Sequence, residues 1–477
     1  MKNLFLLFLM LLGCNNYCFG IVRLPAIWGS HMVVKQCSSV TMWGWSKPGK
    51  DLEIITSWDN HIYNVKVNKD GKWSLAMHTI EAGGPYSISF DDGDLLVLED
   101  VYLGEVWLCS GQSNMEMPMK GYMGQPVKGS TNVIAEANEN VPIRLFSVER
   151  NPSKVETEDC VGSWKRNNSE AVSSFSATAY FFGMQLYKTL RIPIGLVHSS
   201  WAGSVIQTWL PEKSLKNFPD ISLKHLNTDV SVKDPNLVAS MSYNGMIHPI
   251  EKFKYSGVIW YQGESNRDNP GLYEELFKTL ISEWRHLFNE SDLPFYYAQI
   301  APFAYEGSDS TSGAIIREVQ YNIEKQLPNV GMAVLMDIGE EHCIHPSNKK
   351  EVGSRLAYLA LKNTYGKVGI PAMSPRQSSK EIHNGSIILS FDNAPTGLTS
   401  FGNRLSGFEI AGSDGIFYPA VAKIINRKKV KVWSDKVSKP KDVRYGFKNF
   451  VLCNLYGTNG LPVSSFRTDS LDLNTSK

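Results

Sequence analysis

The feature that most constrains the fold is an alternation of apolar strands and amphipathic helices over residues 104–366. We predict strands at 105–109, 143–146, 194–198, 257–261, 295–300 and 331–337, and helices near 174–189, 272–288, 313–326 and 348–362. The clearest helix repeats apolar residues at spacings of three and four, from Tyr273 to Phe288, so one of its faces is apolar. Uninterrupted apolar strands between such helices predict a mainly parallel sheet covered on both faces. Ligands bind at the carboxyl ends of the strands in sandwiches of this kind.

The segments on either side of this region have the pattern of β-structure. Residues 40–45, 52–56, 62–67 and 86–90 resemble short strands, and Asp70-Gly71 and Asp92-Gly93 are hairpin signals. Beyond Pro371 the strand pattern returns at 386–391, 407–410, 420–425 and 429–433. We therefore predict an N-terminal β domain at 21–103, an α/β domain at 104–366 and a C-terminal β module at 367–477.

The first twenty residues have the pattern of an export signal. A lysine at position 2 precedes a nine-residue apolar run, which is too short to span a bilayer, and Cys18 and Gly20 place small residues before a cleavage site. We expect cleavage after Gly20 and a periplasmic or secreted protein. A competing interpretation makes Cys14 a lipidated cysteine. No later stretch is long and apolar enough for a membrane helix.

Charge and cysteine content exclude several functional classes. Lys plus Arg total 48 against 47 for Asp plus Glu, so no basic surplus favours nucleic acid or an anionic membrane as partner. Five cysteines follow the predicted signal, at wide spacings and without a CxxC pair, which argues against a disulfide scaffold or a structural zinc site. One or two disulfides remain open. No metal cluster or phosphate-binding loop is present, so no cofactor is expected, and the oligomeric state is not determined.

Polar residues follow four of the predicted strands. Ser113 comes after the first in a Gly-Gln-Ser-Asn turn, and His198 begins a polar run after the third. Gln262 follows the fourth strand, and His345 comes eight residues after Asp337, where the last strand ends. A serine that only caps the next helix would explain the first turn equally well. The recurrence of such residues at strand ends favours a site there.

Several motifs together resemble the sialate O-acetylesterase family of SGNH (GDSL-like) hydrolases. They are Gly-Gln-Ser-Asn-Met-Glu-Met at 111–117, Trp-Ala-Gly-Ser at 201–204, Tyr-Asn-Gly-Met-Ile at 243–247, Trp-Tyr-Gln-Gly-Glu-Ser-Asn at 260–266 and Ile-His-Pro at 344–346. The resemblance runs from about residue 22 to 468. It implies a flavodoxin-like three-layer sandwich and a serine esterase that acts on carbohydrate.

The resemblance and the positions of the residues assign the catalytic roles. Serine esterases need a nucleophile, a base that takes its proton and donors for the oxyanion. Ser113 is the predicted nucleophile and His345 the predicted base. His198 is a distant second choice as base, because the resemblance places an oxyanion-hole block there, and His248 is expected to be structural.

The predicted oxyanion donors are the backbone amides of Ser113 and Gly203, with a side chain from the block at 260–266. We favour Gln262 there, with Asn266 as a second donor, because an ionised Glu264 would repel the oxyanion. Glu264 is expected to order its own loop or Arg317. The alternative is that this block is only a helix-capping turn.

The third member of the triad departs from the family pattern. SGNH enzymes carry an aspartate two or three residues before the histidine, where this chain has Cys343 and His342. Asp337 ends a strand and is the best-placed acid. A Ser–His dyad, with a backbone carbonyl holding the ring, is the alternative.

These residues imply an exported esterase that removes O-acetyl groups from carbohydrate through an acetyl-serine intermediate. The family name implies O-acetylated sialic acids, and acetylated xylan or pectin fragments are the second substrate class. We expect Trp201, Tyr261, Glu264 and Arg317 to line the substrate site, with Trp209 as a further candidate for stacking on a sugar ring. A non-catalytic glycan-binding module is the remaining alternative.

Overall fold

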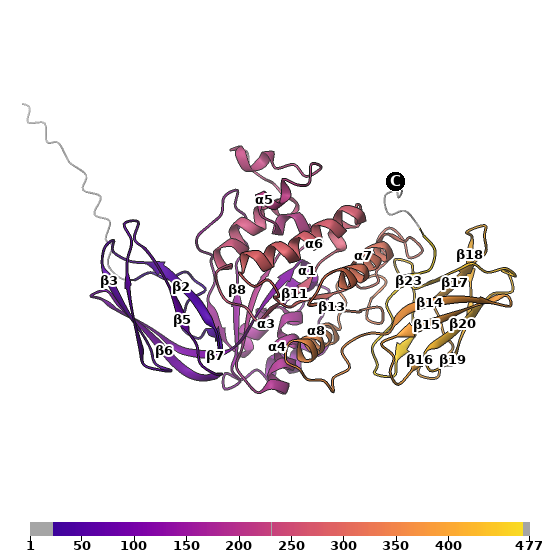
Figure 1. Cartoon of the computed structure of the whole chain (residues 1–477), viewed down its shortest axis with the longest axis horizontal. Coiled ribbons are helices and arrows are strands. Elements are labelled where there is room, and N and C mark those ends of the chain that lie inside the picture. The colour runs from indigo at the N-terminus through magenta and orange to yellow at the C-terminus, as the bar shows by residue number, and fades with distance from the viewer. Residues whose placement is uncertain (1–21, 230, 471–477) are drawn as a thin grey trace, which may run out of the picture.

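A computed structural model describes residues 22–229 and 231–470. The predicted signal segment and Cys14 lie outside these residues. The chain forms a row of three parts, with a β module at each end of a central α/β domain (Figure 1). No helix of the described residues is both long and apolar enough to cross a bilayer.

The central sheet has the strand order β13-β12-β11-β7-β10-β8-β9. Its strands are β7 (Leu95–Gly111), β8 (Ile143–Ser147), β9 (Trp164–Arg166), β10 (Ile194–Ser200), β11 (Gly257–Tyr261), β12 (Phe295–Ala298) and β13 (Val330–Ala333). Every neighbouring pair is parallel except β8 with β9. When β8 and β9 are left aside, the strands across the sheet are β10, β7, β11, β12 and β13. Numbered by their order in the chain, they are the second, first, third, fourth and fifth strands, which is the flavodoxin-like order. The predicted parallel sheet is therefore confirmed, with one extra hairpin at its edge.

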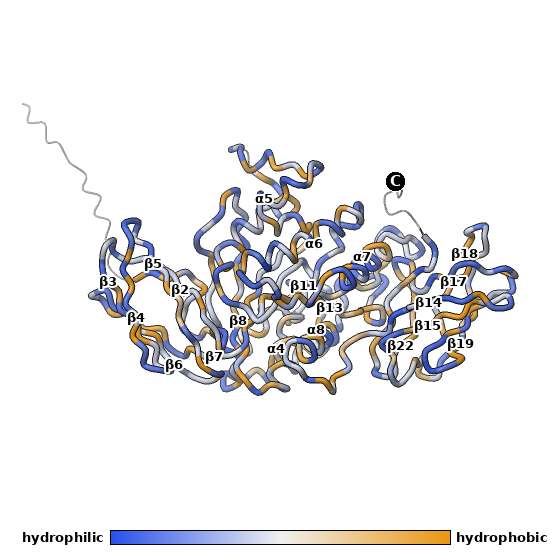
Figure 2. The backbone as a smooth tube through the Cα atoms, viewed as in Figure 1, coloured by the Kyte–Doolittle hydropathy of each residue, from blue (hydrophilic) through white to orange (hydrophobic). Residues whose placement is uncertain are grey.

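Helices cover both faces of this sheet. Alternate residues of β7 point to opposite sides: Val106 and Leu108 belong to one core cluster, and Trp107 and Cys109 belong to the other. The first cluster includes residues of α6 (Pro270–Leu287) and α7 (Ser312–Gln326), and the second includes residues of α4 (Ala177–Leu190) and α8 (Lys349–Asn363). These are the four helices that the sequence predicts. Hydrophobic and hydrophilic residues are interspersed along these helices in Figure 2.

Shorter helices connect these elements. They are α1 (Ser113–Glu116), α2 (Ser130–Ala135), α3 (Ser169–Ser174), α5 (Glu212–Leu215), η1 (Ile206–Trp209), η2 (Lys224–Asn227), η3 (Pro235–Leu237), η4 (Tyr243–Ile247), η5 (His248–Ile250) and η6 (Glu264–Asn266).

The N-terminal module shares a strand with the central domain. It contains β1 (Val33–Lys35), β2 (Ser39–Trp45), β3 (Asp51–Thr56), β4 (His61–Lys66), β5 (Lys72–His78), β6 (Gly83–Asp91) and the first part of β7. β7 pairs with β6 and β1 over its first part and with β10 and β11 over its second. The predicted boundary between residues 103 and 104 thus falls inside one continuous strand, where Leu103 is fully buried.

The C-terminal module is built from short antiparallel strands. They are β14 (Arg376–His383), β15 (Ser386–Asp392), β16 (Leu398–Thr399), β17 (Phe408–Ala411), β18 (Phe417–Pro419), β19 (Val421–Asn426), β20 (Lys429–Trp433), β21 (Asp442–Tyr445), β22 (Tyr456–Gly457) and β23 (Phe466–Arg467). Arg467 forms an ion pair with Glu318 of α7 at 2.8 Å, and Gln299 bonds Ser464 at 2.8 Å. This module is therefore fastened to the α7 side of the central domain.

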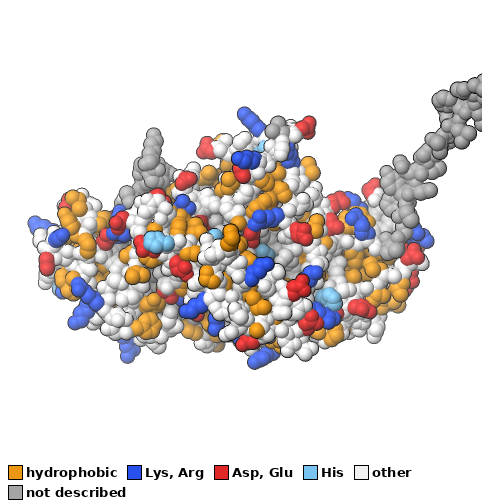
Figure 3. Space-filling view, turned by 180° about the vertical axis from the view of Figure 1, so that it is seen from behind, with side chains coloured by type: hydrophobic (Ala, Val, Ile, Leu, Met, Phe, Trp, Pro, Cys, Tyr) orange, Lys and Arg blue, Asp and Glu red, His pale blue; other side chains and the backbone are white. Residues whose placement is uncertain are grey.

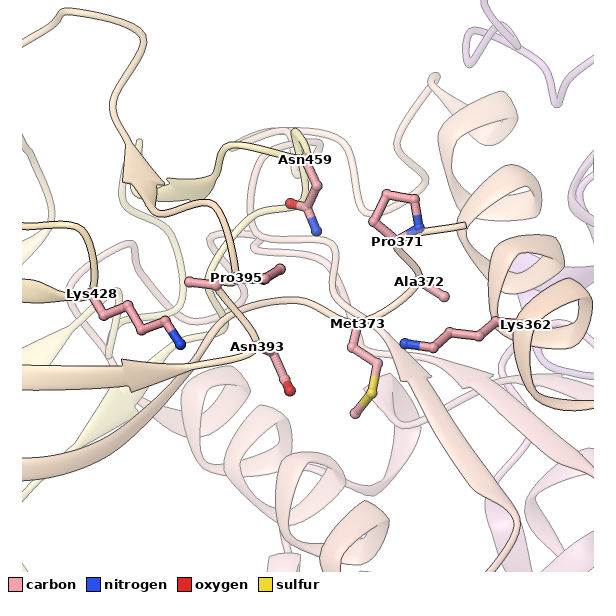
Figure 4. Close-up of a pocket in the computed structure, with 9 residues that line it drawn as sticks. Lys362, Pro371, Ala372, Met373, Asn393, Pro395, Lys428 and Asn459 are labelled. Atoms are coloured by element: carbon pink, nitrogen blue, oxygen red, sulfur yellow. The ribbon is translucent and has the colours of Figure 1, made fainter. Parts of the chain in front are cut away.

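A cavity of about 290 Å³ lies between the end of α8 and the C-terminal module. The side chains of Lys362 and Lys428 point into it from opposite sides (Figure 4). Lys349, which begins α8, lies thirteen positions before Lys362, or about 20 Å along the helix. Because Lys349 belongs to the network beside Ser113 described below, this cavity lies away from that site.

Candidate active site

Ser113 lies where β7 ends and α1 begins. Gly111 has a φ of +140°, and a Cβ at that position would lie 2.1 Å from the carbonyl oxygen of Tyr261, so no larger residue fits there. The Gln112 backbone amide donates to the same carbonyl at 2.9 Å, and its side-chain oxygen accepts from Gly263 at 3.2 Å. The ends of β7 and β11 are thereby held together, with Ser113 between them.

His345 lies in the loop before α8, and its ring is held by an uncharged side chain. The amide oxygen of Gln125 bonds Nδ1 of His345. An amide oxygen only accepts hydrogen bonds, so Nδ1 carries the hydrogen and Nε2 keeps a lone pair that can take a proton. The ring of Tyr122 packs edge-on against the imidazole, with 5.2 Å between ring centroids.

Two contacts bring the His345 loop to Ser113. The Tyr122 hydroxyl lies 3.3 Å from the carbonyl oxygen of Ser113 and 3.2 Å from a carboxylate oxygen of Glu116, two acceptors for its one hydrogen, while its ring contacts His345. The Asn114 amide donates to the carbonyl oxygen of Ile344 at 3.0 Å. The Ser113 hydroxyl and the His345 ring form no direct hydrogen bond within the described residues, and such bonds often shorten only when substrate binds.

The environment of His345 keeps its ring neutral at physiological pH. Burial, with a smaller contribution from the positive charge of Lys349, lowers the pKa of His345 to about 4. A histidine that is neutral at pH 7 can act as a general base without first losing a proton.

Two backbone amides can bind an oxyanion. Those of Ser113 and Gly203 donate to no protein acceptor within the described residues. Gly203 is exposed and has a φ of +71°, a conformation that favours glycine. The neighbouring Ala202 amide donates to Glu116 of α1 at 2.8 Å, so the loop after β10 is fastened to the helix that begins with Ser113.

The structure does not support the predicted side-chain donors. Gln262 is fully buried, and its amide group donates to Ser204 O at 3.2 Å and to Asn266 Oδ1 at 2.6 Å. Asn266 in turn donates to Gln207 at 3.2 Å. The burial of Gln262 and the acceptors already bound by both amide groups thus make these side chains supports of the site. The prediction that they bind the oxyanion is corrected to a role in ordering the loops after β10 and β11.

A buried polar network lies behind Ser113. Asn114 donates to Glu264 Oε1 at 2.7 Å, and its own side-chain oxygen accepts from Lys349 Nζ. Burial raises the pKa of Glu264 and lowers that of Lys349 to about 7. Glu264 is 3 % exposed and therefore does not face substrate. The side chain of Glu264 thus joins the loop after β11 to α1 and, through Asn114, to Lys349 of α8, rather than lining a substrate site.

The contacts of Asp337 and Arg317 differ from those expected. Both carboxylate oxygens of Asp337 bind Arg355 of α8, each at 2.7 Å, and Gln125 occupies the position at Nδ1 of His345 that an orienting acid would take. Arg317 is fully buried and donates to Ser465 Oγ at 3.1 Å and Gly446 O at 3.2 Å. It connects α7 to the C-terminal module rather than lining a substrate site.

Of the aromatic candidates, only Trp201 is accessible to a sugar. Tyr261 and Trp209 are fully buried, so neither can stack on a sugar ring. Trp201 is partly exposed, and the guanidinium of Arg150 lies 5.5 Å from the centroid of its ring. Arg150 also forms an ion pair with Glu116, which lies one helical turn after Ser113 in α1. Trp201 and Arg150 therefore lie close to Ser113.

Sequence reasoning missed six residues of this site, which are Asn114, Glu116, Tyr122, Gln125, Arg150 and Lys349. Asn114 and Glu116 lie within the Gly-Gln-Ser-Asn-Met-Glu-Met motif and could have been singled out from it. Tyr122 and Gln125 lie in a turn closed by reciprocal backbone hydrogen bonds of 3.0 Å, and no local pattern marks them. Within residues 22–229 and 231–470, no three His, Cys, Asp or Glu side chains converge as metal ligands would.

Comparisons with known proteins agree with this arrangement. The family model for carbohydrate esterases of the sialic acid-specific acetylesterase type matches residues 103–362. The human sialate O-acetylesterase is 30 % identical over 394 residues, which cover 75 % of this chain and 74 % of that protein. The mouse sialate O-acetylesterase is 28 % identical over 424 residues, with 76 % and 77 % covered. The crystal structure of a carbohydrate acetylesterase from Xanthomonas citri superposes with a TM-score of 0.86 at 34 % identity, covering 94 % of this chain and all of that one.

A parallel α/β sheet with polar side chains converging at its strand ends, together with this structural match, defines an SGNH-like carbohydrate esterase. Within that class, the chain belongs to the sialic acid-specific acetylesterase family. It is accordingly a carboxylic ester hydrolase.

Proposed function

We propose that this chain removes O-acetyl groups from sialic acids by way of an acetyl-serine intermediate, with Ser113 as nucleophile and His345 as base. The observation that carries the proposal is the neutral imidazole of His345, held by Gln125 at Nδ1 and connected to Ser113 through Tyr122. Family membership supports O-deacetylation of carbohydrate in general.

The proposed reaction has two halves. Ser113 Oγ attacks the acetyl carbonyl carbon while its proton passes to Nε2 of His345, and the amides of Ser113 and Gly203 bind the resulting oxyanion. The intermediate collapses as the sugar oxygen leaves and takes the proton from His345. Water then attacks the acetyl-serine with His345 again as base, which releases acetate and restores the Ser113 hydroxyl.

Trp201 and Arg150 are the side chains that we assign to the sugar. An accessible indole can stack on the apolar face of a sugar ring, and Arg150 retains guanidinium donors beyond its pair with Glu116. A second candidate substrate class is acetylated plant polysaccharide. The similar solved structure from Xanthomonas citri is named a carbohydrate acetylesterase, without reference to sialic acid, so its name does not restrict the sugar. Export of the protein is part of the proposal and rests on the sequence of residues 1–20.

The first test is hydrolysis of a chromogenic acetyl ester by the wild type and by Ser113→Ala. We expect the variant to lose on the order of 10⁶-fold in kcat, because without the nucleophile only binding and the oxyanion hole still contribute to catalysis. Ser130→Ala is the matched control, since its side chain forms no hydrogen bond within the described residues. Equal rates for Ser113→Ala and the wild type would refute the esterase mechanism and favour a glycan-binding role.

Substrate class is tested by acetate release. We expect faster release from O-acetylated sialic acid than from acetylated xylan, measured as kcat/KM with the same enzyme preparation. A preference for xylan would overturn the sialate assignment and leave the esterase mechanism intact.

A further inference from the structure

A second groove lies between the N-terminal module and the central domain. Its volume is about 790 Å³, within the range of roughly 300–1,000 Å³ that is common for ligand sites. One wall is the β2–β5 sheet, and the other comes from the turn at His248, Pro249 and Lys252. None of its residues belongs to the machinery assigned above to ester hydrolysis.

The sheet wall presents tryptophans beside polar side chains. In the register of β2 and β5, Trp43 lies opposite Ser74 and Trp45 opposite Lys72, so these four side chains share one face. Trp43 is 8 % exposed and packs edge-on against Trp28, whereas Trp45 is only partly buried. Trp43 therefore forms part of the floor of the groove. The guanidinium of Arg23 lies 3.8 Å from the centroid of the Trp45 ring, so only the remaining surface of this partly buried ring is open to a ligand.

Three lysines and one acidic residue line the groove, and two further acids lie beside His248 at its edge. Lys66, Lys72 and Lys252 line it, and Glu158 is its only acidic lining residue. Glu158 pairs with Lys72, while the side chains of Lys66 and Lys252 form no ion pair within residues 22–229 and 231–470. The nearby acids Glu156 and Glu251 lie 3.4 and 3.7 Å from Nε2 of His248. Two lysines therefore remain to attract an anion.

A neutral hydrogen-bond donor lines the same groove. The side-chain oxygen of Asn68 accepts from the backbone amides of Asp70 and Lys72 at 3.0 and 2.8 Å, which leaves its NH₂ group free to donate. Donors and cations beside aromatic surface suit hydroxyl and carboxylate groups on a ring with an apolar face.

On the face in Figure 3, basic and acidic side chains are interspersed, in agreement with the balanced composition. We propose that the groove between β2–β5 and His248–Lys252 is an accessory binding site for carboxylated oligosaccharides, with Lys66 and Lys252 binding the carboxylates and Trp45 contacting a sugar ring. Such a site would hold the esterase on acidic glycans independently of catalysis.

The test is titration calorimetry at low salt with three unacetylated probes: trigalacturonate, 3′-sialyllactose and neutral xylotriose. We expect the wild type to bind at least one acidic probe with a Kd below about 1 mM and xylotriose more weakly. The double variant Lys66→Gln/Lys252→Gln should weaken that binding by about tenfold, since two exposed charge contacts are lost. Binding of trigalacturonate would indicate a site for uronate carboxylates, and binding of 3′-sialyllactose would indicate a site for sialate carboxylates.

The matched control is Lys50→Gln/Lys69→Gln, which removes the same charge from exposed positions of the same module outside the groove. It should leave the Kd within about twofold of the wild type, because screening limits the effect of distant charges. Equal weakening by both double variants, tighter binding of xylotriose, or no binding of either acidic probe would overturn the proposal. Chromogenic ester hydrolysis should stay unchanged in both variants, so failure here is distinguishable from failure of the esterase proposal.

Discussion

At the scale of the residue, the unusual feature is the neutral partner of His345. A carboxylate at Nδ1 would both orient the ring and stabilise the imidazolium that forms during catalysis. The Gln125 amide orients the ring through the same nitrogen but brings no negative charge. The low pKa of His345 fits this arrangement, because burial and Lys349 both disfavour the protonated ring.

Replacing Gln125 tests whether this contact supports catalysis. For Gln125→Ala we expect kcat to fall by about tenfold with little change in KM, since one neutral hydrogen bond, worth about 1 kcal/mol, no longer fixes the ring. The measurement is steady-state hydrolysis of a chromogenic acetyl ester. Gln125→Glu is the informative second variant. A carboxylate at Nδ1 stabilises the protonated ring and should raise the pKa of His345, so the acidic limb of the pH profile should move to higher pH. An unchanged kcat in Gln125→Ala would show that the ring is held without this contact.

The pKa of His345 predicts the acid dependence of the reaction. The base must be unprotonated, and its pKa is lowered from 6.5 to about 4. The rate should therefore persist as the pH falls from 7 to 5 and decline as it approaches 4. The measurement is kcat/KM against pH, and an acidic limb at or above pH 6.5 would contradict the assignment.

The stability of the fold must be followed in parallel. A histidine with a depressed pKa stabilises the fold fully above the unfolded value near 6.5, and this contribution is lost as the pH falls toward the folded value. Circular dichroism at each pH separates loss of structure from protonation of the base.

At the scale of the element, charged pairs join helices to strands rather than serving the reaction. Arg355 of α8 donates to the backbone at Val334 as well as to Asp337, so it fastens this helix to the chain that follows β13. Because α8 begins with Lys349 and directly follows the His345 loop, the Arg355–Asp337 pair helps to fix the position of His345, the proposed base.

Asp337→Asn separates these two roles. The Arg355 side chain is 5 % exposed, so removing its anionic partner should cost about 3–5 kcal/mol of unfolding free energy. Activity per folded molecule should change by less than about threefold, whereas loss of a triad acid costs about 10⁴-fold. Chemical denaturation and active-site titration measure the two quantities. A large fall in kcat with unchanged stability would restore Asp337 as the orienting acid.

At the scale of the whole molecule, β7 makes the N-terminal module and the central domain one folding unit. Its seventeen residues serve two sheets, and Trp164 of β9 donates its indole N–H to Ile27 at 2.7 Å across the same junction. Trp28 and Phe253 pack with ring centroids 4.8 Å apart. The module therefore covers apolar surface that the central domain cannot bury alone.

A chain shortened to begin at residue 104 tests this dependence. We expect it to aggregate or to unfold without a cooperative transition, because exposed apolar surface costs about 25 cal/mol per Å². Soluble yield and thermal unfolding, compared with the chain that begins at residue 21, are the measurements. A monomeric, cooperatively folded and active shortened protein would refute the shared-strand argument.

The local pattern was sufficient for most regular elements of the central domain. The predicted strand at 331–337 is corrected, because β13 ends at Ala333 and Asp337 lies in the turn that follows rather than at a strand end. The predicted helix at 313–326 lies within one residue of α7, and the predicted strand at 257–261 coincides with β11. Both elements have apolar residues at their own period, and burial of that face fixes them wherever they lie in the fold. β5 was missed, because its stability depends on pairing with β2 rather than on its own pattern.

The amino-acid sequence by itself determined the sheet, its helices and the position of Ser113 at a strand end, since these follow from local periodicity and chain connectivity. Only the tertiary structure decided which polar side chains remain accessible. Gln262, Tyr261 and Arg317 have the chemistry for a site but are fully buried, and burial depends on neighbours that are distant in the chain. The partner of His345 was likewise decided in three dimensions: Gln125 lies 220 positions away, and nothing local marks it.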